Sequence, residues 1–323
     1  MSKGDAIVKK IVYSVFCICS FLVLMNTSSL AHNNLYQSNY FTGVDDVEIF
    51  YQYWEVNNPI ATLVISHGIG EHSDRYLEMV DYFTNLGLSC YTLDHRGHGR
   101  SGGNRWNVKD FGYFIEDLHT YLQIVKTRLT DKKIFLLGHS MGGEIALQYA
   151  ITYPEDIDGL IASSPSVGAY LGGMDIPTYL ARGMDIALTP LVKNNVIANI
   201  PMPATQIDPS LLSHDEKNYT AYANDPMVSH EPIKLRMSAE LSKGMLYLQD
   251  NAGLLKVPSL ILYGTEDQVV PPNKIIKFYD KITIDDKKLI GYDGYYHEIF
   301  NEIGKISVYQ DTEEWIMQRI SYY

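Results

Sequence analysis

Short apolar runs alternate along the chain with longer segments of mixed polarity. The apolar runs predict β-strands at residues 61–66, 88–93, 133–137, 159–164 and 258–264, with a shorter strand at 288–290. A β-hairpin is expected near residues 44–56, and helices are predicted at residues 74–86, 108–129 and 143–150. Strands that alternate with helices predict an α/β fold with a mostly parallel, doubly wound sheet and a site at its carboxyl edge.

The segment Gly138-His139-Ser140-Met141-Gly142 lies between a predicted strand and a predicted helix. A G-x-S-x-G motif in this context indicates a nucleophile elbow, a turn so sharp that the serine adopts a strained backbone conformation. Its flanking glycines give the close backbone approach that side chains would block. The motif therefore predicts that the Ser140 hydroxyl is presented at the start of a helix, where negative charge is favoured.

A nucleophilic serine needs a base and an orienting carboxylate, which follow this type of elbow in the order acid, then histidine. The late strand at residues 258–264 is followed at once by Thr265-Glu266-Asp267, and the only histidine beyond it is His297. Ser140, Asp267 and His297 are therefore the predicted triad. Glu266 and Asp293 remain alternatives for the acid, and Asp267 alternatively caps the helix that begins near Pro272.

The tetrahedral intermediate of acyl transfer needs backbone N–H donors aimed at its oxyanion. The amide of Met141, directly after the nucleophile, is one predicted donor. The loop after the strand at 61–66, His67-Gly68-Ile69-Gly70-Glu71-His72, supplies the amide of Ile69 as the other. His67 and His72 are expected to brace this loop.

Between about residues 167 and 256 the alternation stops, and the sequence becomes helix-like and proline-rich. Because this stretch lies between the nucleophile and the acid, it is predicted to form a helical cap inserted before the late strands. Apolar residues recur there at three- and four-residue spacing, and Leu180, Met184 and Leu188 are taken as candidate substrate-binding residues. Two interpretations stay open: a face that packs on the core, or an apolar lip that guides an acyl chain and touches a lipid surface.

Three motifs together resemble the monoacylglycerol lipase and lysophospholipase group of α/β-hydrolases, often labelled serine aminopeptidase-like. They are SHGIGEHSDRY at residues 66–76, LDHRGHGRS at 93–101 and GHSMGG at 138–143. The resemblance extends from about residue 40 to the C-terminus. It implies an α/β-hydrolase fold and ester hydrolysis of single-chain acyl lipids, with the triad and oxyanion donors named above. The family often has a smaller residue at position 69, so Ile69 is expected to narrow the acyl pocket.

Two further patterns are weighed and set aside. Residues 97–102 fit G-x-G-x-x-G, but no helix opens directly on the last glycine, so a dinucleotide site is disfavoured. Asp94, His95 and His98 lie close together, but they do not form the closed four-ligand set of a structural zinc site. The expected reaction requires no cofactor and no metal.

Charge and the N-terminal segment add two expectations. The formal net charge of −12, without a basic run, disfavours nucleic acid as a partner. Residues 1–31 combine Lys3, Lys9 and Lys10 with an apolar run and the small residues Ser29 and Ala31. This pattern predicts a signal peptide cleaved after Ala31 and an exported hydrolase domain at residues 32–323, with an uncleaved membrane anchor as the alternative.

The predicted activity is hydrolysis of a monoacylglycerol or lysophospholipid ester through an acyl-enzyme on Ser140. An acyltransferase, thioesterase or peptidase would use the same triad, and the sequence does not separate these from an esterase. A non-catalytic binding protein is disfavoured, because every part of the catalytic apparatus is present. The sequence leaves the head group, the acyl-chain length and the oligomeric state open.

Overall fold

The computed structural model describes residues 35–129, 132–168, 170–171, 174–175, 178–202, 205 and 207–320. The predicted signal peptide at residues 1–31 lies outside this range. None of the described helices is both long and apolar enough to cross a membrane.

The described residues form an eight-stranded sheet with strand order β1-β2-β4-β3-β5-β6-β9-β10. All strand pairs from β4 to β10 are parallel, whereas β1–β2 and β2–β4 are antiparallel. The strands are β1 (Leu35–Thr42), β2 (Glu48–Glu55), β3 (Ala61–Ser66), β4 (Leu88–Leu93), β5 (Ile134–His139), β6 (Gly159–Ser163), β9 (Ser259–Gly264) and β10 (Lys287–Tyr292). The prediction of a mostly parallel α/β sheet is confirmed.

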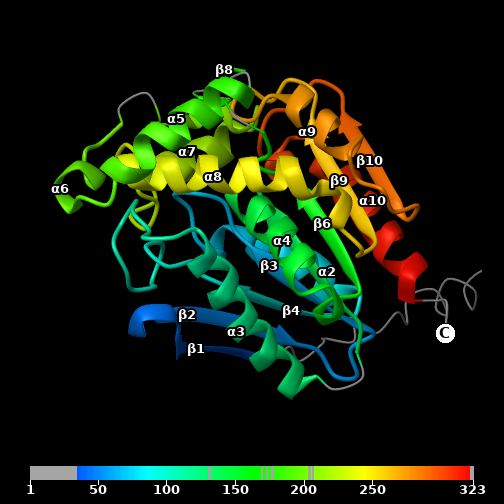
Figure 1. Cartoon of the computed structure of the whole chain (residues 1–323). Coiled ribbons are helices and arrows are strands. Elements are labelled where there is room, and N and C mark those ends of the chain that lie inside the picture. The colour runs from blue at the N-terminus through cyan, green and yellow to red at the C-terminus, as the bar shows by residue number, and fades with distance from the viewer. Residues whose placement is uncertain are drawn as a thin grey trace, which may run out of the picture. The chain divides into compact units, whose positions relative to one another are not determined.

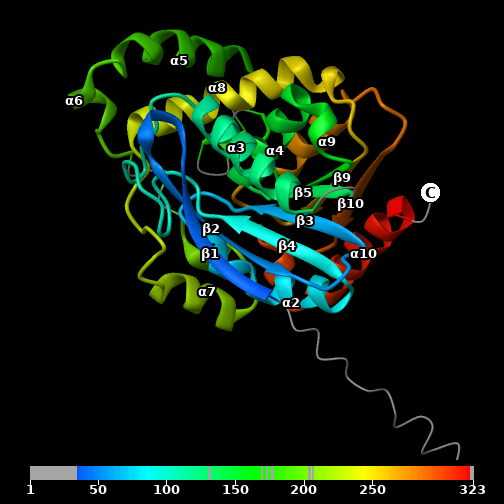
Figure 2. The same cartoon turned by 90° about the horizontal axis from the view of Figure 1, so that it is seen from below.

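Helices cover both faces of the sheet (Figures 1 and 2). One apolar cluster joins the sheet to α3 (Gly112–Arg128), α4 (Met141–Thr152) and α9 (Pro272–Tyr279). A second joins the opposite face to α2 (Leu77–Asn85) and α10 (Lys305–Ile320). Because the central strands are buried on both faces, their sequences are continuous apolar runs, which is why the pattern located them.

The first strand of the predicted hairpin lies upstream of the predicted range. The hairpin pairs β1 at residues 35–42 with β2, and residues 44–46 form its turn. Almost every residue of this edge strand is exposed, so its sequence lacks an apolar run. Aromatic contacts across the pair stabilise it instead, with ring centroids 5.3 Å apart for Tyr36 and Trp54 and 5.4 Å apart for Tyr40 and Phe50.

A helical cap is inserted between β6 and β9 (Figure 1). Its elements are the short strands β7 (Tyr170–Leu171) and β8 (Met174–Asp175), and the helices α5 (Thr178–Leu191), α6 (Asn195–Ala198), α7 (Glu216–Asn224) and α8 (Leu235–Asn251). The long helix α8 packs on α4, the helix that follows the elbow, and Gly244 provides the space that the Glu144 side chain fills. The cap is thereby seated next to the carboxyl edge of the sheet.

Candidate active site

Ser140 lies in a sharp turn between β5 and α4, with φ 54° and ψ −117°. A positive φ is a strained backbone conformation for any residue other than glycine, so neighbouring residues must hold Ser140 in place. They do so through a hydrogen bond of 2.9 Å from the Ser140 amide to the Ser163 carbonyl oxygen. A β-carbon at Gly142 would overlap the carbonyl oxygens of Ser66 and His67, so only glycine permits this approach.

Asp267 and His297 come together from two different loops at the carboxyl edge of the sheet. His297 Nδ1 lies 2.7 Å from Asp267 Oδ2, and both side chains are buried. The second oxygen, Asp267 Oδ1, accepts hydrogen bonds from the amides of Val269 and Val270 at 2.8 and 2.9 Å. A carboxylate accepts, so Nδ1 carries the proton and Nε2 of the neutral ring is left able to take one.

The alternative acids lie elsewhere. Glu266 and Asp293 are both exposed, and Asp293 is paired with the Thr265 hydroxyl at 3.5 Å. Among the three carboxylates considered from the sequence, the structure therefore joins Asp267 to the histidine.

Charge around His297 favours its protonated form. Burial opposes that form, but the carboxylate of Asp267, followed by those of Glu298 and Glu71, outweighs burial and raises the pKa of His297. The neighbouring His139 ring, with its centroid 4.8 Å away, stays neutral because burial lowers its pKa to about 4. The site thus contains one histidine suited to gaining a proton and one that stays uncharged.

The loop after β3 lies directly against Ser140. A β-carbon at Gly68 would come within 3.2 Å of Ser140 Cβ, and the Gly68 amide donates a 2.6 Å hydrogen bond to Glu71 Oε1. Ile69 is partly buried against the core. Met141 is the first residue of α4, a position whose amide has no acceptor within its own helix. The two predicted oxyanion donors therefore lie on adjoining segments.

Two histidines brace this loop. His67 Nδ1 donates to the Gly68 carbonyl oxygen at 2.7 Å, and His67 Nε2 accepts from the His95 amide at 2.9 Å. His72 Nε2 lies 2.9 Å from Asp225 Oδ2 of the cap. Asp94, considered above as a metal ligand, instead accepts from the Ser73 amide and hydroxyl and from the Arg100 amide. No group of side chains in the described part of the chain is arranged to hold a metal ion.

A buried ion network beside the site was not predicted from the sequence. Arg75 Nη1 contacts Glu71 Oε2 at 2.7 Å, and its two terminal nitrogens bind both carboxylate oxygens of Glu298 at 2.7 and 2.8 Å. Glu71 and Arg75 are four positions apart, but Glu71 precedes the 3₁₀ turn Ser73–Tyr76, so the helical spacing rule does not predict their pairing. Nothing local marks Glu298, which lies far along the chain.

Comparison with known proteins gives the same family as the motifs. The model of the family described as "Serine aminopeptidase, S33" matches residues 57–304. The chain belongs to this family of hydrolases. A monoacylglycerol lipase of Mycolicibacterium smegmatis is 32% identical over 281 residues, covering 87% of this chain and 96% of that protein. A monoglyceride lipase of Rattus norvegicus is 30% identical over 285 residues, covering 87% and 91%.

Solved structures agree in fold. The monoacylglycerol lipase of Paleococcus ferrophilus superposes with a TM-score of 0.72 at 26% identity, covering 84% of this chain and 99% of that one. A soluble variant of the Saccharomyces cerevisiae monoglyceride lipase, in complex with a substrate analog, gives a TM-score of 0.73 at 24% identity, covering 87% and 94%. The chain has the α/β-hydrolase fold, as the motifs predicted.

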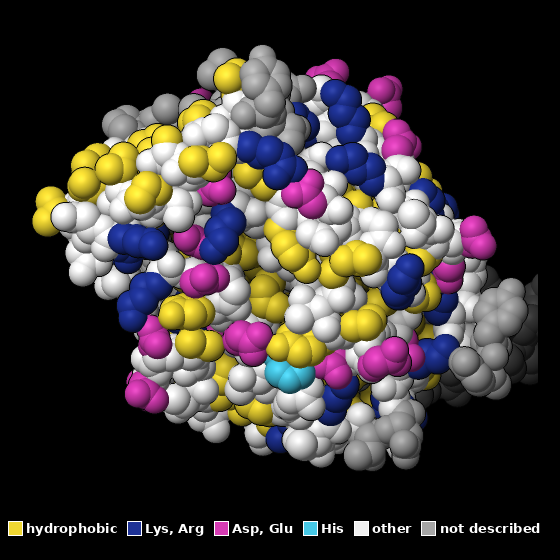
Figure 3. Space-filling view, viewed as in Figure 1, with side chains coloured by type: hydrophobic (Ala, Val, Ile, Leu, Met, Phe, Trp, Pro, Cys, Tyr) yellow, Lys and Arg dark blue, Asp and Glu magenta, His cyan; other side chains and the backbone are white. Residues whose placement is uncertain are grey.

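In this S33-family chain the three candidate cap residues all lie on α5. Leu180 and Met184 are 49% and 45% exposed, and Leu188 is partly buried. Hydrophobic side chains gather over α5 and α6 (Figure 3). The exposed ones are Leu180, Met184, Ile186, Leu191, Val196 and Ile200. This exposure disfavours the interpretation in which the whole apolar face packs on the core.

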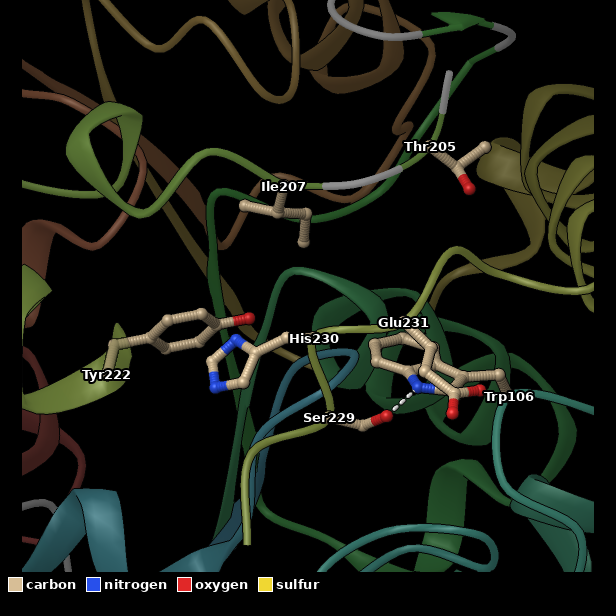
Figure 4. A pocket seen from close by; sticks show the side chains of 7 residues that line it. All are labelled: Trp106, Thr205, Ile207, Tyr222, Ser229, His230 and Glu231. Atoms are coloured by element: carbon tan, nitrogen blue, oxygen red, sulfur yellow. Dashed lines mark hydrogen bonds between the residues drawn. The ribbon is translucent and has the colours of Figure 1, made fainter. Parts of the chain in front are cut away.

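A small pocket lies where the other half of the cap meets the body of the protein (Figure 4). It is lined by Trp106, Thr205, Ile207, Tyr222, Ser229, His230 and Glu231. The Trp106 indole N–H donates to the Ser229 hydroxyl, and the Ser229 amide donates to the Gly70 carbonyl oxygen at 3.0 Å. The bond to Gly70 attaches the cap to the loop that carries Ile69, and the bond from Trp106 attaches it to the segment between β4 and α3.

We expect Asp267→Asn to lose far more esterase activity than Glu266→Gln or Asp293→Asn, because only Asp267 bonds to His297. The loss expected for removing a triad acid is on the order of 10⁴-fold in kcat. The three purified variants are to be compared on one soluble ester. If Glu266→Gln loses its activity and Asp267→Asn keeps it, the catalytic acid is Glu266 and not Asp267.

The raised pKa of His297 predicts the acid limb of the pH–rate profile. The base must be neutral to accept the Ser140 proton, so activity falls as pH drops through this pKa. The midpoint of the acid limb in kcat/KM should therefore lie at a pH above about 6.5, the ordinary pKa of histidine. Steady-state rates across pH on a neutral ester measure it, and a limb below that value contradicts the prediction.

Proposed function

We propose that this protein is a serine hydrolase that cleaves the carboxylic ester of single-chain acyl lipids, a monoacylglycerol or a lysophospholipid. The observation that carries the proposal is the hydrogen bond between Asp267 and His297 Nδ1, which leaves the other ring nitrogen available as a base. Membership of the S33 family and the named relatives support ester hydrolysis.

In the proposed reaction, His297 Nε2 removes the proton from Ser140 as its hydroxyl oxygen attacks the ester carbonyl carbon. The amides of Ile69 and Met141 bind the resulting oxyanion. Collapse of the intermediate breaks the ester bond, and the alcohol leaves with the proton from His297. Water then attacks the acyl carbon as His297 takes one of its protons. The second tetrahedral intermediate collapses by breaking the bond between this carbon and Ser140 Oγ, and His297 returns the proton to Oγ as the fatty acid leaves. Asp267 holds the ring and stabilises its charged form throughout.

The exposed apolar surface of the cap favours a lipid as the substrate. The exposed apolar residues of α5 and α6 suit transient contact with a lipid surface, from which one acyl chain passes beneath the cap. The net charge of −12 weakens attraction to anionic membranes, so this contact rests on apolar burial. We further propose that residues 1–31 direct export, with a mature chain that begins at His32; retention as an N-terminal anchor is the alternative.

Replacing Ser140 with Ala should abolish ester hydrolysis without unfolding the protein, because it removes one oxygen atom and keeps the backbone hydrogen bond from the residue 140 amide to Ser163. The expected loss in turnover is on the order of a thousandfold or more. Activity on a soluble ester and labelling by a fluorophosphonate test it, with circular dichroism as the check of folding. A folded Ser140→Ala enzyme with more than a few per cent of wild-type activity contradicts the nucleophile.

Specificity, as kcat/KM, should rise from acetyl to medium or long acyl esters, because each buried methylene contributes about 0.8 kcal/mol. Two-chain lipids should be poor substrates. Leu180→Asp should reduce the rate on long-chain esters more than on short ones, since Leu180 is half exposed on α5. The matched control is Ile306→Asp on α10, which is 51% exposed on an element outside the cap.

Steady-state kinetics on an acyl-length series, with monoacylglycerol vesicles for the longest chains, measures both effects. A flat or falling dependence on chain length would show that the enzyme is a small-ester or amide hydrolase. Equal losses for Leu180→Asp and Ile306→Asp would remove α5 from the substrate path.

A further inference from the structure

One buried guanidinium joins the two loops that carry the proposed catalytic groups. Arg75, on the 3₁₀ turn Ser73–Tyr76, has a side chain only 8% exposed, and its partners Glu71 and Glu298 are 4% and 5% exposed. It binds Glu298 with both terminal nitrogens and Glu71 with one of them. Such a two-pronged contact fixes orientation as well as distance.

Glu71 connects this network to the loop after β3 at residues 67–72, which carries Ile69 and is called the oxyanion loop below. Glu71 Oε1 accepts from the Gly68 amide at 2.6 Å and from the Tyr76 hydroxyl at 2.7 Å. Gly68 precedes Ile69 and lies against Ser140. The position of Glu71 therefore sets the position of the peptide that donates to the oxyanion.

The Glu298 end leads to the base and to the cap. Glu298 directly follows His297, and its amide donates to the Leu212 carbonyl oxygen of the cap at 2.7 Å. Its carboxylate also accepts from the side-chain amides of Asn218 and Asn301, each at 2.9 Å. The Tyr222 ring of α7 lies against the Arg75 guanidinium, 4.7 Å from its centroid.

The three groups are all charged. Burial opposes the charged forms, but the Arg75 cation outweighs it and holds the pKa of Glu71 and that of Glu298 below the ordinary range. Their carboxylates in turn raise the pKa of Arg75. Separating one member of a buried ion network from the others would leave an uncompensated buried charge, which is strongly destabilising. The three side chains are therefore held together.

We propose that Arg75 is a positioning residue that holds the oxyanion loop and the His297 loop at a fixed separation by binding Glu71 and Glu298 at once. This inference rests on the proposed function, since it takes His297 as the base and Ile69 as an oxyanion donor. A displacement of about 1 Å between such groups costs on the order of 100-fold in rate.

The test is Arg75→Lys, with Arg100→Lys as its matched control. Lysine keeps the charge but cannot form the two-pronged contact. Arg100 makes a comparable pair with Asp74, is one-third exposed and contacts none of the proposed catalytic groups. We expect Arg75→Lys to lower kcat about 10- to 100-fold with KM changed less than about threefold. Arg100→Lys should leave both constants near wild type.

Binding of a tetrahedral mimic separates positioning from general damage. An alkyl trifluoromethyl ketone needs the oxyanion donors and the base together, so its affinity for Arg75→Lys should fall by the same factor as kcat/KM. Wild-type kcat in a folded Arg75→Lys enzyme overturns the proposal. So does a lowered kcat with unchanged affinity for the ketone.

The pH profile supplies a readout that a purely structural role would not move. The groups that face His297 are Asp267, Glu298, Glu71 and the neutral His139. Glu298→Gln removes one negative charge that favours protonated His297, so the acid limb of kcat/KM should move to lower pH. Arg75→Lys keeps the cation, so its limb should stay near the wild-type position. An unmoved limb in Glu298→Gln contradicts the electrostatic coupling between Glu298 and His297.

If Arg75→Lys does not fold, Asn218→Ala on α7 decides. It removes the hydrogen bond that Asn218 donates to Glu298 and the one that it accepts from Arg75 at 3.4 Å, and it leaves all three charges in place. A fall in kcat at constant KM supports the proposal, and unchanged kinetics overturn it. Wild-type enzyme without activity on any ester would instead refute the proposed function, which keeps the two failures distinct.

Discussion

The close contact between Gly142 and the end of β3 is the constraint on which the site depends. A β-carbon at this position would overlap the carbonyl oxygens of Ser66 and His67. Because glycine stands there, the first turn of α4 approaches the loop after β3, and Gly68 reaches Ser140. Ser140, the proposed nucleophile, and the segments that carry both proposed oxyanion donors are thus brought together by backbone packing. The parallel order β3-β5-β6-β9 then delivers Asp267 and His297 to the same edge.

Around this constraint the structure separates neutral from charged side chains. His139 is held neutral by burial, which lowers its pKa to about 4, and burial lowers the pKa of His98 to about 3. The carboxylates of Asp267, Glu298 and Glu71 lie near His297 and raise its pKa against the effect of burial. In the proposed reaction His297 is therefore suited to take up a proton, whereas His139 and His98 stay neutral. Arg75 balances the carboxylates of Glu71 and Glu298, which limits the cost of burying them.

The parts that the sequence predicted are those with local signals. The central strands have continuous apolar sequences, and the elbow motif has a fixed spacing. The sequence therefore predicts the positions of both within a few residues. Chain order and the position of Asp267 just after the late strand predict the pairing of Asp267 with His297, and the two side chains lie 2.7 Å apart. Arg75 and Glu298 were missed because 223 positions separate them, and no pattern relates residues at that distance. Strand β1 was missed because an exposed edge strand needs no apolar run.

The cap combines two kinds of attachment, and this division bears on how substrate enters. Residues around α7 are bound to the oxyanion loop by polar contacts, through His72 with Asp225 and Gly70 with Ser229. Helix α5 meets α8 through a small apolar cluster of Ala181 and Leu246, and most of its apolar side chains remain exposed. Covering these side chains with lipid is favourable by about 25 cal/mol per Å². A lipid surface would therefore contact the cap at α5. The residues around α7 would keep their polar contacts with the oxyanion loop and hold the proposed oxyanion donors in place.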